Sequence, residues 1–149
     1  MGWLIARNVM LLKDKLFALH IAEDDTCLLC WNASETHEHL FHSCEYSRQV
    51  YGELARRCGI SLPVGNALLW LGSCQVSKLK KGVLLCAFMA AQYHLWMQRN
   101  KARIEGCLIR PEILGSLIFQ EIKLWVHTRL SSAIIISGKN WLASLQLLV

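Results

Sequence analysis

Three cysteines and three histidines lie within one short segment, and their side chains are well suited to binding a metal ion. From Cys27 to Cys44 the segment reads CLLCWNASETHEHLFHSC. Its spacing, C-x2-C-x8-H-x4-C, offers two thiolates from one tight turn and a second pair of ligands from further along the chain. Zinc favours four tetrahedral ligands of this kind, and a site without an open position is structural rather than catalytic. The spacing therefore predicts one structural Zn²⁺.

The fourth ligand has three candidates, His37, His39 and His42. His37 and His39 point to opposite faces if the segment is extended, and His42 lies only two residues from Cys44, which makes a short chelate. Spacing favours His39. The predicted metal ligands are Cys27, Cys30, His39 and Cys44.

Two other interpretations of the cysteines stay open. A C-x-x-C pair can be redox-active, but that function requires a strand–turn–helix context, and the sequence EDDT before Cys27 does not resemble a buried strand. Cysteines are also common as small buried residues. We expect this second, structural role for Cys58, on the apolar face of a predicted helix, and for the isolated Cys74.

Composition indicates a folded protein with reduced thiols. The 149 residues are enough for one domain with a real core, and 54% of them are apolar. Two prolines and nine glycines argue against low complexity. Seven cysteines is an odd number, and the N-terminus does not resemble a secretory signal peptide. We therefore expect an intracellular location, with nucleus and cytoplasm both open.

The net charge of +5 is unevenly distributed. Residues 21–47 carry six acidic side chains and no lysine or arginine, whereas residues 48–149 carry thirteen basic and four acidic ones. Phosphate affinity comes mainly from lysine and arginine. Any contact with nucleic acid is therefore expected from the basic part of the chain and not from the metal-binding segment.

Apolar periodicity predicts a mainly α fold: a small Cys3His zinc knuckle held between helices, followed by a helical bundle. Leu40 and Phe41 are expected to anchor the knuckle to its flanking helices. Residues 1–60 form the zinc-binding module and residues 61–149 a helical region continuous with it, so that both belong to one domain. The predicted helices cover residues 9–20, 45–58, 78–103 and 111–133, with a further turn at 68–71 and a C-terminal tail, 138–149, whose order stays open.

The 45–58 helix has the clearest signals at its two ends. Glu45 lies in its first turn, Arg56 and Arg57 lie in its last turn, and Gly59 follows as a cap. The 78–103 helix is apolar nearly all round for fifteen residues, which is too short for a membrane span of about 20 residues. A central buried helix is therefore expected, and membrane association through residues 82–98 is the weaker alternative.

The chain resembles the zinc-binding region that follows the reverse transcriptase in plant non-LTR (LINE-type) retrotransposons. The signature block is Cys27-Leu28-Leu29-Cys30 followed by Glu35-Thr36-His37-Glu38-His39-Leu40-Phe41-His42-Ser43-Cys44. Supporting blocks are Trp3 to Leu16, with its Lys13-Asp14-Lys15-Leu16 run, Tyr93-His94-Leu95-Trp96 and Arg99-Asn100. The resemblance covers about residues 3–130 and implies that His39 is the ligand. One departure is Leu12, where the family usually has a residue with a hydroxyl group. The absence of that hydroxyl is expected to weaken the start of the helix.

The resemblance implies a non-catalytic accessory module of a retroelement polyprotein. Polymerase chemistry needs carboxylates that hold two metal ions, but the only Asp-Asp pair, Asp24-Asp25, lies in a predicted turn. Ribonuclease H needs a cluster of four acidic residues, and those that follow Glu45 lie on predicted helical segments: Glu53, Glu105, Glu112 and Glu121. No catalytic activity is predicted for this chain.

Two functions remain in view. In the first, the module helps to bind RNA or DNA, alongside other parts of the polyprotein, through basic residues at the ends of the long helix: Lys78, Lys80, Lys81, Arg99, Lys101 and Arg103. These residues are also compatible with an ordinary solvated surface. In the second, the chain is a structural or protein-interaction remnant that binds no nucleic acid.

Overall fold

A computed structural model describes residues 10–58, 72–73, 75, 77–129 and 142–143. Within these ranges the protein is mostly helical, and no β-strand forms beyond one isolated bridge between Thr26 and Ser34. The predicted turn at 68–71, the side chains of Cys58 and Cys74, and the tail from 138 apart from residues 142–143 lie outside the described residues.

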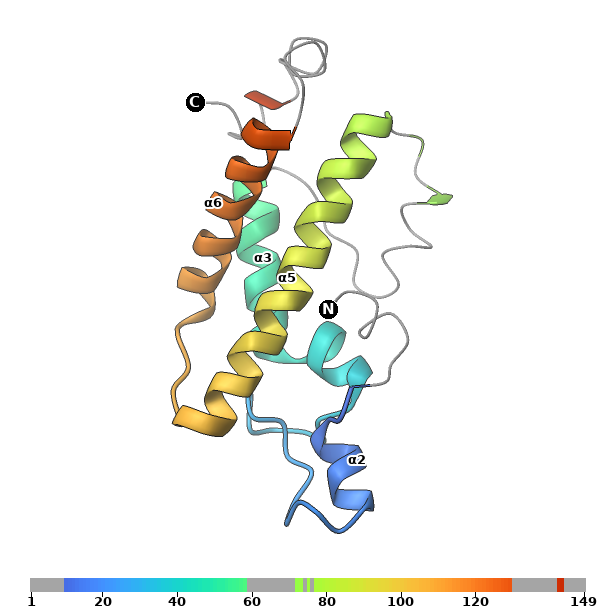
Figure 1. Ribbon diagram of the computed structural model, residues 1–149, viewed down its shortest axis with the longest axis vertical. Coiled ribbons are helices and arrows are strands. Elements are labelled where there is room, and N and C mark those ends of the chain that lie inside the picture. Colours follow the sequence, from blue (N-terminus) through green and yellow to red (C-terminus); the bar gives the residue numbers. More distant parts are fainter. Residues whose placement is uncertain (1–9, 59–71, 74, 76, 130–141, 144–149) are drawn as a thin grey trace.

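Three long helices form a bundle: α3 (Glu45–Cys58), α5 (Lys78–Glu105) and α6 (Pro111–Arg129). In Figure 1, α3 and α6 run in the same direction and α5 runs in the opposite direction beside them. The short helix α2 (Lys13–Ala18) and the knuckle, defined here as residues 27–44, lie at the end of the bundle where α3 begins and α5 ends. The knuckle therefore contacts the beginning of one long helix and the end of another.

Local signals explain where the helices begin and end. The hydroxyl of Ser77 accepts a hydrogen bond from the Lys80 backbone N–H (3.4 Å) and begins α5, and Gly106, with φ +67°, ends it in the left-handed conformation that glycine tolerates best. Pro111 opens α6, where its missing N–H costs nothing. The predicted bounds of α3 are confirmed, and α5 runs two residues beyond its predicted end.

Helix α2 is shorter than the 9–20 segment predicted from periodicity. Its first flanking residue, Leu12, has an extended backbone with φ −90° and ψ 167°, so the helix begins only at Lys13. At the other end, His20 adopts a positive φ of 56°, which is incompatible with continued helix. The helix thus covers only six residues.

One hydrophobic core joins the knuckle to the bundle. Leu40 and Phe41 are fully buried and belong to the same cluster of apolar side chains as Val50 of α3, Leu95 of α5 and Ile118 of α6. The expected anchoring by Leu40 and Phe41 is confirmed. A metal bound in the knuckle would therefore stabilise segments that also pack against all three long helices.

Helix α5 is buried on one face only, although its sequence is apolar nearly all round. Val83, Ala91 and Leu95 are buried, whereas Tyr93 and Met97 are exposed by 39% and 42%. The helix has α3, α6 and the knuckle as neighbours, and they cover one side of it. In the part of the chain that the structure describes, no helix combines the length and apolar character needed to cross a membrane.

Candidate metal centre

The structure brings together the four side chains that the spacing selected. The candidate ligand atoms of Cys27, Cys30, His39 and Cys44 all lie within 4.8 Å of one another. The Sγ atoms of Cys27 and Cys44 are 4.0 Å apart, and Cys30 Sγ lies 3.2 Å from His39 Nε2. Tetrahedral zinc with Zn–S bonds of about 2.3 Å separates two sulfurs by about 3.8 Å. The donor types and their separations fit a closed Cys3His zinc site.

A tight turn presents the first two cysteines. The Cys27 N–H donates to the Ala33 carbonyl (2.7 Å), and the Trp31 N–H donates to the Cys27 carbonyl (2.9 Å). Trp31 has a positive φ of 56°, which reverses the chain directly after Cys30. The bridge between Thr26 and Ser34 closes the base of this loop. The backbone therefore directs both thiols to the same side.

A single π-turn, η1 (His39–Ser43), presents the second pair of ligands. The Cys44 N–H donates to the His39 carbonyl five residues earlier (2.7 Å). Residues five apart in an α-helix lie about 140° apart around the axis, because 3.6 residues make one turn. The wider turn places His39 and Cys44 close together, and such π-turns are frequent at functional sites.

The surroundings of the three histidines distinguish their roles. His42 is buried and stacks on Phe88, with ring centroids 6.4 Å apart, and His37 packs on Phe41 at 4.9 Å. Burial lowers the pKa of His42, which keeps this ring neutral in the core. His39 instead directs Nε2 at Cys30, while its Nδ1 lies 3.4 Å from Ser43 Oγ. A partner on the second nitrogen is the usual way in which a metal-binding imidazole is oriented.

The two buried thiols influence each other strongly. The hydrogen bond between them lowers the pKa of Cys44 and raises the pKa of Cys27, and burial adds to the rise at Cys27. Two buried sulfurs at this separation do not both ionise without a positive charge between them. A bound zinc ion would supply that charge, and its binding would release the remaining protons.

The other two ligands lie at the edge of the site. Cys30 and His39 are only partly buried and line a hollow of about 600 Å³ between the knuckle, the start of α3 and the start of α6. Trp31, Glu45 and Gln49 also line it. This hollow provides a path by which a metal ion can reach the ligands.

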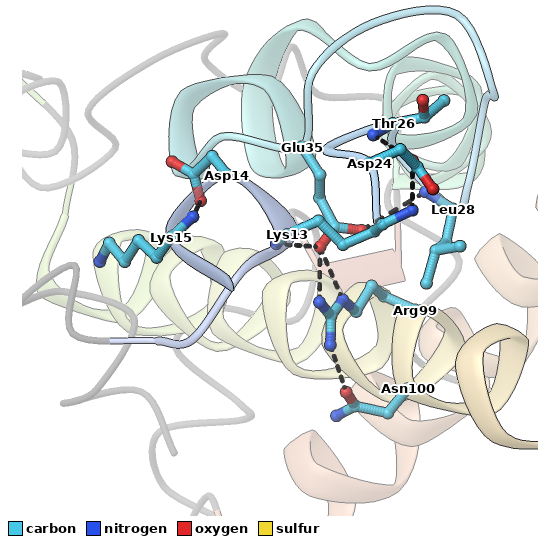
Figure 2. Close-up of polar contacts among 9 residues, drawn as sticks. All are labelled: Lys13, Asp14, Lys15, Asp24, Thr26, Leu28, Glu35, Arg99 and Asn100. Carbon is cyan, nitrogen blue, oxygen red and sulfur yellow. Dashed lines mark hydrogen bonds and ion pairs between the residues drawn. The ribbon is translucent and has the colours of Figure 1, made fainter. Parts of the chain in front are cut away.

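A buried ion pair joins the knuckle to α5. The Glu35 carboxylate and the Arg99 guanidinium are 0% and 1% exposed, and Arg99 donates to Glu35 Oε1 from Nε (2.9 Å) and from Nη2 (2.6 Å). Figure 2 shows the guanidinium of Arg99 pointing at the Glu35 carboxylate from below, while the backbone nitrogen of Lys13 meets the same carboxylate from the left. Arg99 therefore does not lie on the basic surface that the sequence predicted, because its charge is already neutralised inside the protein.

The remaining predicted nucleic-acid contacts fall into two separate groups. Lys78, Lys80 and Lys81 lie in the first turn of α5, and Lys101 and Arg103 lie near its end. A rise of 1.5 Å per residue places Lys80 and Lys101 about 32 Å apart. Lys101 also lies 3.7 Å from Glu105. The structure thus gives two small basic groups at opposite ends of one helix.

Glu35 is the residue that sequence reasoning missed. The sequence showed it as one acidic side chain of an acidic segment and as part of the signature block, and nothing local indicated that it is buried. Its partner carried a usable signal: Arg99 follows Ala91 and Leu95 at helical spacing, on the buried stripe of α5. An arginine on an apolar stripe indicates a buried carboxylate somewhere else in the fold.

Comparison with known proteins places the first third of the chain in context. Residues 1–51 match the family model described as zinc-binding in reverse transcriptase. This range is narrower than the resemblance over residues 3–130 expected from the sequence. Searches of curated proteins and of solved structures gave no match. The segment that holds all four candidate ligands is therefore similar to the zinc-binding region of reverse transcriptases.

Proposed function

We propose that this chain binds one structural Zn²⁺ through Cys27, Cys30, His39 and Cys44. The observation that carries the proposal is the convergence of these four side chains, from a tight turn and a π-turn, on one small volume. The family match over the same residues supports zinc in particular. Four protein ligands leave no open position for a substrate, so the metal acts by stabilising the fold.

In the same proposal, the chain is a non-catalytic accessory module derived from the reverse transcriptase polyprotein of a plant LINE-type retrotransposon. The family match describes a zinc-binding region and not a catalytic one, which supports this role. Other parts of such a polyprotein are its expected partners. Its three candidate thiolate ligands suit an intracellular compartment, in which thiols stay reduced.

In the first form of this role, the module contributes to nucleic-acid binding. The candidate contacts are the two basic groups of α5, without Arg99: Lys78, Lys80, Lys81, Lys101 and Arg103. The knuckle lies within the chain's most acidic segment and faces the bundle through Leu40 and Phe41. Phosphates are therefore expected at the helix ends and not at the metal.

The second form is purely structural, with zinc only holding the helices together. The inward packing of the knuckle and the buried pair between Glu35 and Arg99 favour it. Salt-dependent binding of single-stranded RNA separates the two forms, because only the first uses the basic groups.

Metal analysis of the purified chain tests the zinc site directly. We expect one zinc per chain, and loss of that zinc in Cys27→Ser and Cys44→Ser, because each removes one of four ligands. Cys107→Ser is the matched control, since Cys107 is exposed and lies outside the cluster. A folded, metal-free parent chain overturns the proposal, as does a Cys107→Ser variant that loses zinc while Cys44→Ser keeps it.

A further inference from the structure

The carboxylate of Glu35 connects three parts of the molecule. Its Oε1 accepts hydrogen bonds from the Lys13 backbone N–H at the start of α2 (3.0 Å) and from Arg99 of α5, and its Oε2 lies 3.4 Å from the Leu28 backbone N–H in the ligand turn. Figure 2 shows these groups converging on one side chain. Because Leu28 directly follows Cys27, the carboxylate holds the turn that presents the first two thiols.

Arg99 is itself held in place by its neighbours on α5. Its Nη1 donates to Asn100 Oδ1 (3.1 Å), and its guanidinium carbon lies 5.2 Å from the centre of the Trp96 ring. The neighbours of Arg99 on α5 therefore fix the orientation of its guanidinium plane. In this orientation two of its N–H groups point at the carboxylate of Glu35. A lysine at this position keeps the charge but loses that geometry.

Full burial makes each member of the pair dependent on the other. A carboxylate or a guanidinium that stays in the interior without its partner is strongly unfavourable, so removal of one charge forces the other toward water. For Glu35, movement toward water breaks its bonds to Leu28 and Lys13. The ligand turn then loses the contacts that fix its position.

We propose that Glu35 and Arg99 are positioning residues of the metal centre, so that zinc affinity depends on α5. Arg99 lies 64 residues from Glu35 and outside the segment that matches the family model. The inference rests on the proposed zinc site. The metal-binding unit is then the 1–51 segment docked on α5 through one buried ion pair, and not the segment alone.

Zinc affinity, measured by competition with a chromogenic chelator, tests this role in the full chain. We expect Arg99→Met and Glu35→Gln each to weaken zinc binding about 10–100-fold, the usual effect of losing a group that orients metal ligands. Arg103→Met, an exposed position on the same helix, is the matched control and should change affinity by no more than about twofold. Co²⁺ in place of zinc adds a spectroscopic readout of the thiolate geometry.

A double variant and a stability control separate positioning from general stabilisation. Glu35→Gln with Arg99→Met should bind zinc about as well as the weaker single variant, because both remove the same contact. Ile118→Val, in the core between the long helices, should lower the free energy of unfolding but leave the zinc affinity and the Co²⁺ spectrum of the folded protein unchanged. Arg99→Lys should retain part of the affinity.

Several outcomes overturn the inference. One is a folded Arg99→Met variant with the zinc affinity and Co²⁺ spectrum of the parent. Another is a double variant whose loss of zinc affinity, as a free energy, equals the sum of the losses in the two single variants. If Arg99→Met, Arg99→Lys and Glu35→Gln all fail to fold at saturating zinc, the pair sustains the fold and is not a positioning device for the metal. A parent chain that binds no zinc is a different result, because it removes the proposed function itself.

Discussion

Two tyrosines on α3, Tyr46 and Tyr51, show how a single buried hydroxyl affects this bundle. Tyr46 donates to the Ile109 carbonyl before α6 (2.8 Å), whereas the Tyr51 hydroxyl is buried without a hydrogen-bond partner among the described residues. Burial raises the pKa of Tyr46 to about 12, and it raises that of Tyr51 further. Both rings are neutral at physiological pH, but of the two hydroxyls only that of Tyr46 has a hydrogen-bond partner in the described part of the chain.

We expect Tyr51→Phe to be neutral or to raise the free energy of unfolding by about 1 kcal/mol, because it removes an unsatisfied buried hydroxyl. Tyr46→Phe, the matched change on the same helix, should lower it by about 1 kcal/mol, because the Ile109 carbonyl loses its donor. Urea unfolding of the zinc-loaded chain measures both. A larger loss in the Tyr51 variant than in the Tyr46 variant would contradict the argument.

At the level of single residues, the sequence was enough to predict the four candidate ligands but not the contacts of the residues around them. Cysteine and histidine spacing is local information, and it selected the four side chains that converge. The choice of His39 depended on spacing, while the structure adds the stacking of His42 on Phe88. The partner of Glu35 lies 64 residues away, and no local pattern specifies a pairing over that distance.

Among the elements, α3 and α6 approach each other closely at Gly115. A Cβ atom at this position would lie 2.8 Å from Cγ and 2.9 Å from Cβ of Glu53 on α3. Glu53 cannot easily move, because hydrogen bonds from Arg56 and Arg57 hold its carboxylate and keep its pKa at about 2. The glycine is therefore needed for packing and not for its backbone freedom.

Alanine scanning of two glycines tests this packing. Gly115→Ala should lower the free energy of unfolding by about 1–2 kcal/mol, because overpacking outweighs the better helix propensity of alanine. Gly82→Ala is the control: no atom lies within 4 Å of its added Cβ, so α5 should gain about 0.5–1 kcal/mol. Thermal unfolding followed by circular dichroism compares the two, and stabilisation by both changes would show that α3 and α6 can separate freely.

The long helices were predictable because their end signals agree with their periodicity. Glu45, Arg56 and Arg57 marked both ends of α3, and its bounds are confirmed. The π-turn at His39–Ser43 was not predictable, since its five residues are too few for a periodic pattern and its shape depends on the ligands at its two ends. Helix α2 was predicted too long because apolar spacing does not report the extended backbone of Leu12 or the positive φ of His20, which bound the helix on its two sides.

Across the whole molecule, the surroundings of the two ends of α5 differ in charge. The basic group Lys78, Lys80 and Lys81 opens the helix, and the acidic segment 21–47 lies near the opposite end. A single strand of nucleic acid would be attracted to the first and repelled by the second. The first turn of α5 is therefore the better place to test for phosphate contacts.

If single-stranded RNA binds there, replacing Lys78, Lys80 and Lys81 together by glutamine should make the slope of log K against log salt shallower by about 2, since each phosphate contact on a single strand contributes about 0.7. Fluorescence anisotropy over a salt series measures this slope. The control removes the same charge elsewhere, by replacing Arg48, Arg110 and Lys123 with glutamine, and should leave the slope unchanged. If the parent chain does not bind RNA at low salt, the proposed nucleic-acid binding is wrong and the structural role remains.

The pairing of Glu35 with Arg99 also affects the order in which the nascent chain can fold. A ribosome adds about 5–20 residues per second, so roughly 3–13 s separate the synthesis of these two residues. All four candidate ligands are complete before Arg99 exists, because Cys44 is the last of them. During that interval the Glu35 carboxylate has no guanidinium partner and stays hydrated. If zinc affinity depends on this pair, the nascent chain binds zinc weakly at first and reaches full affinity only after α5 has emerged.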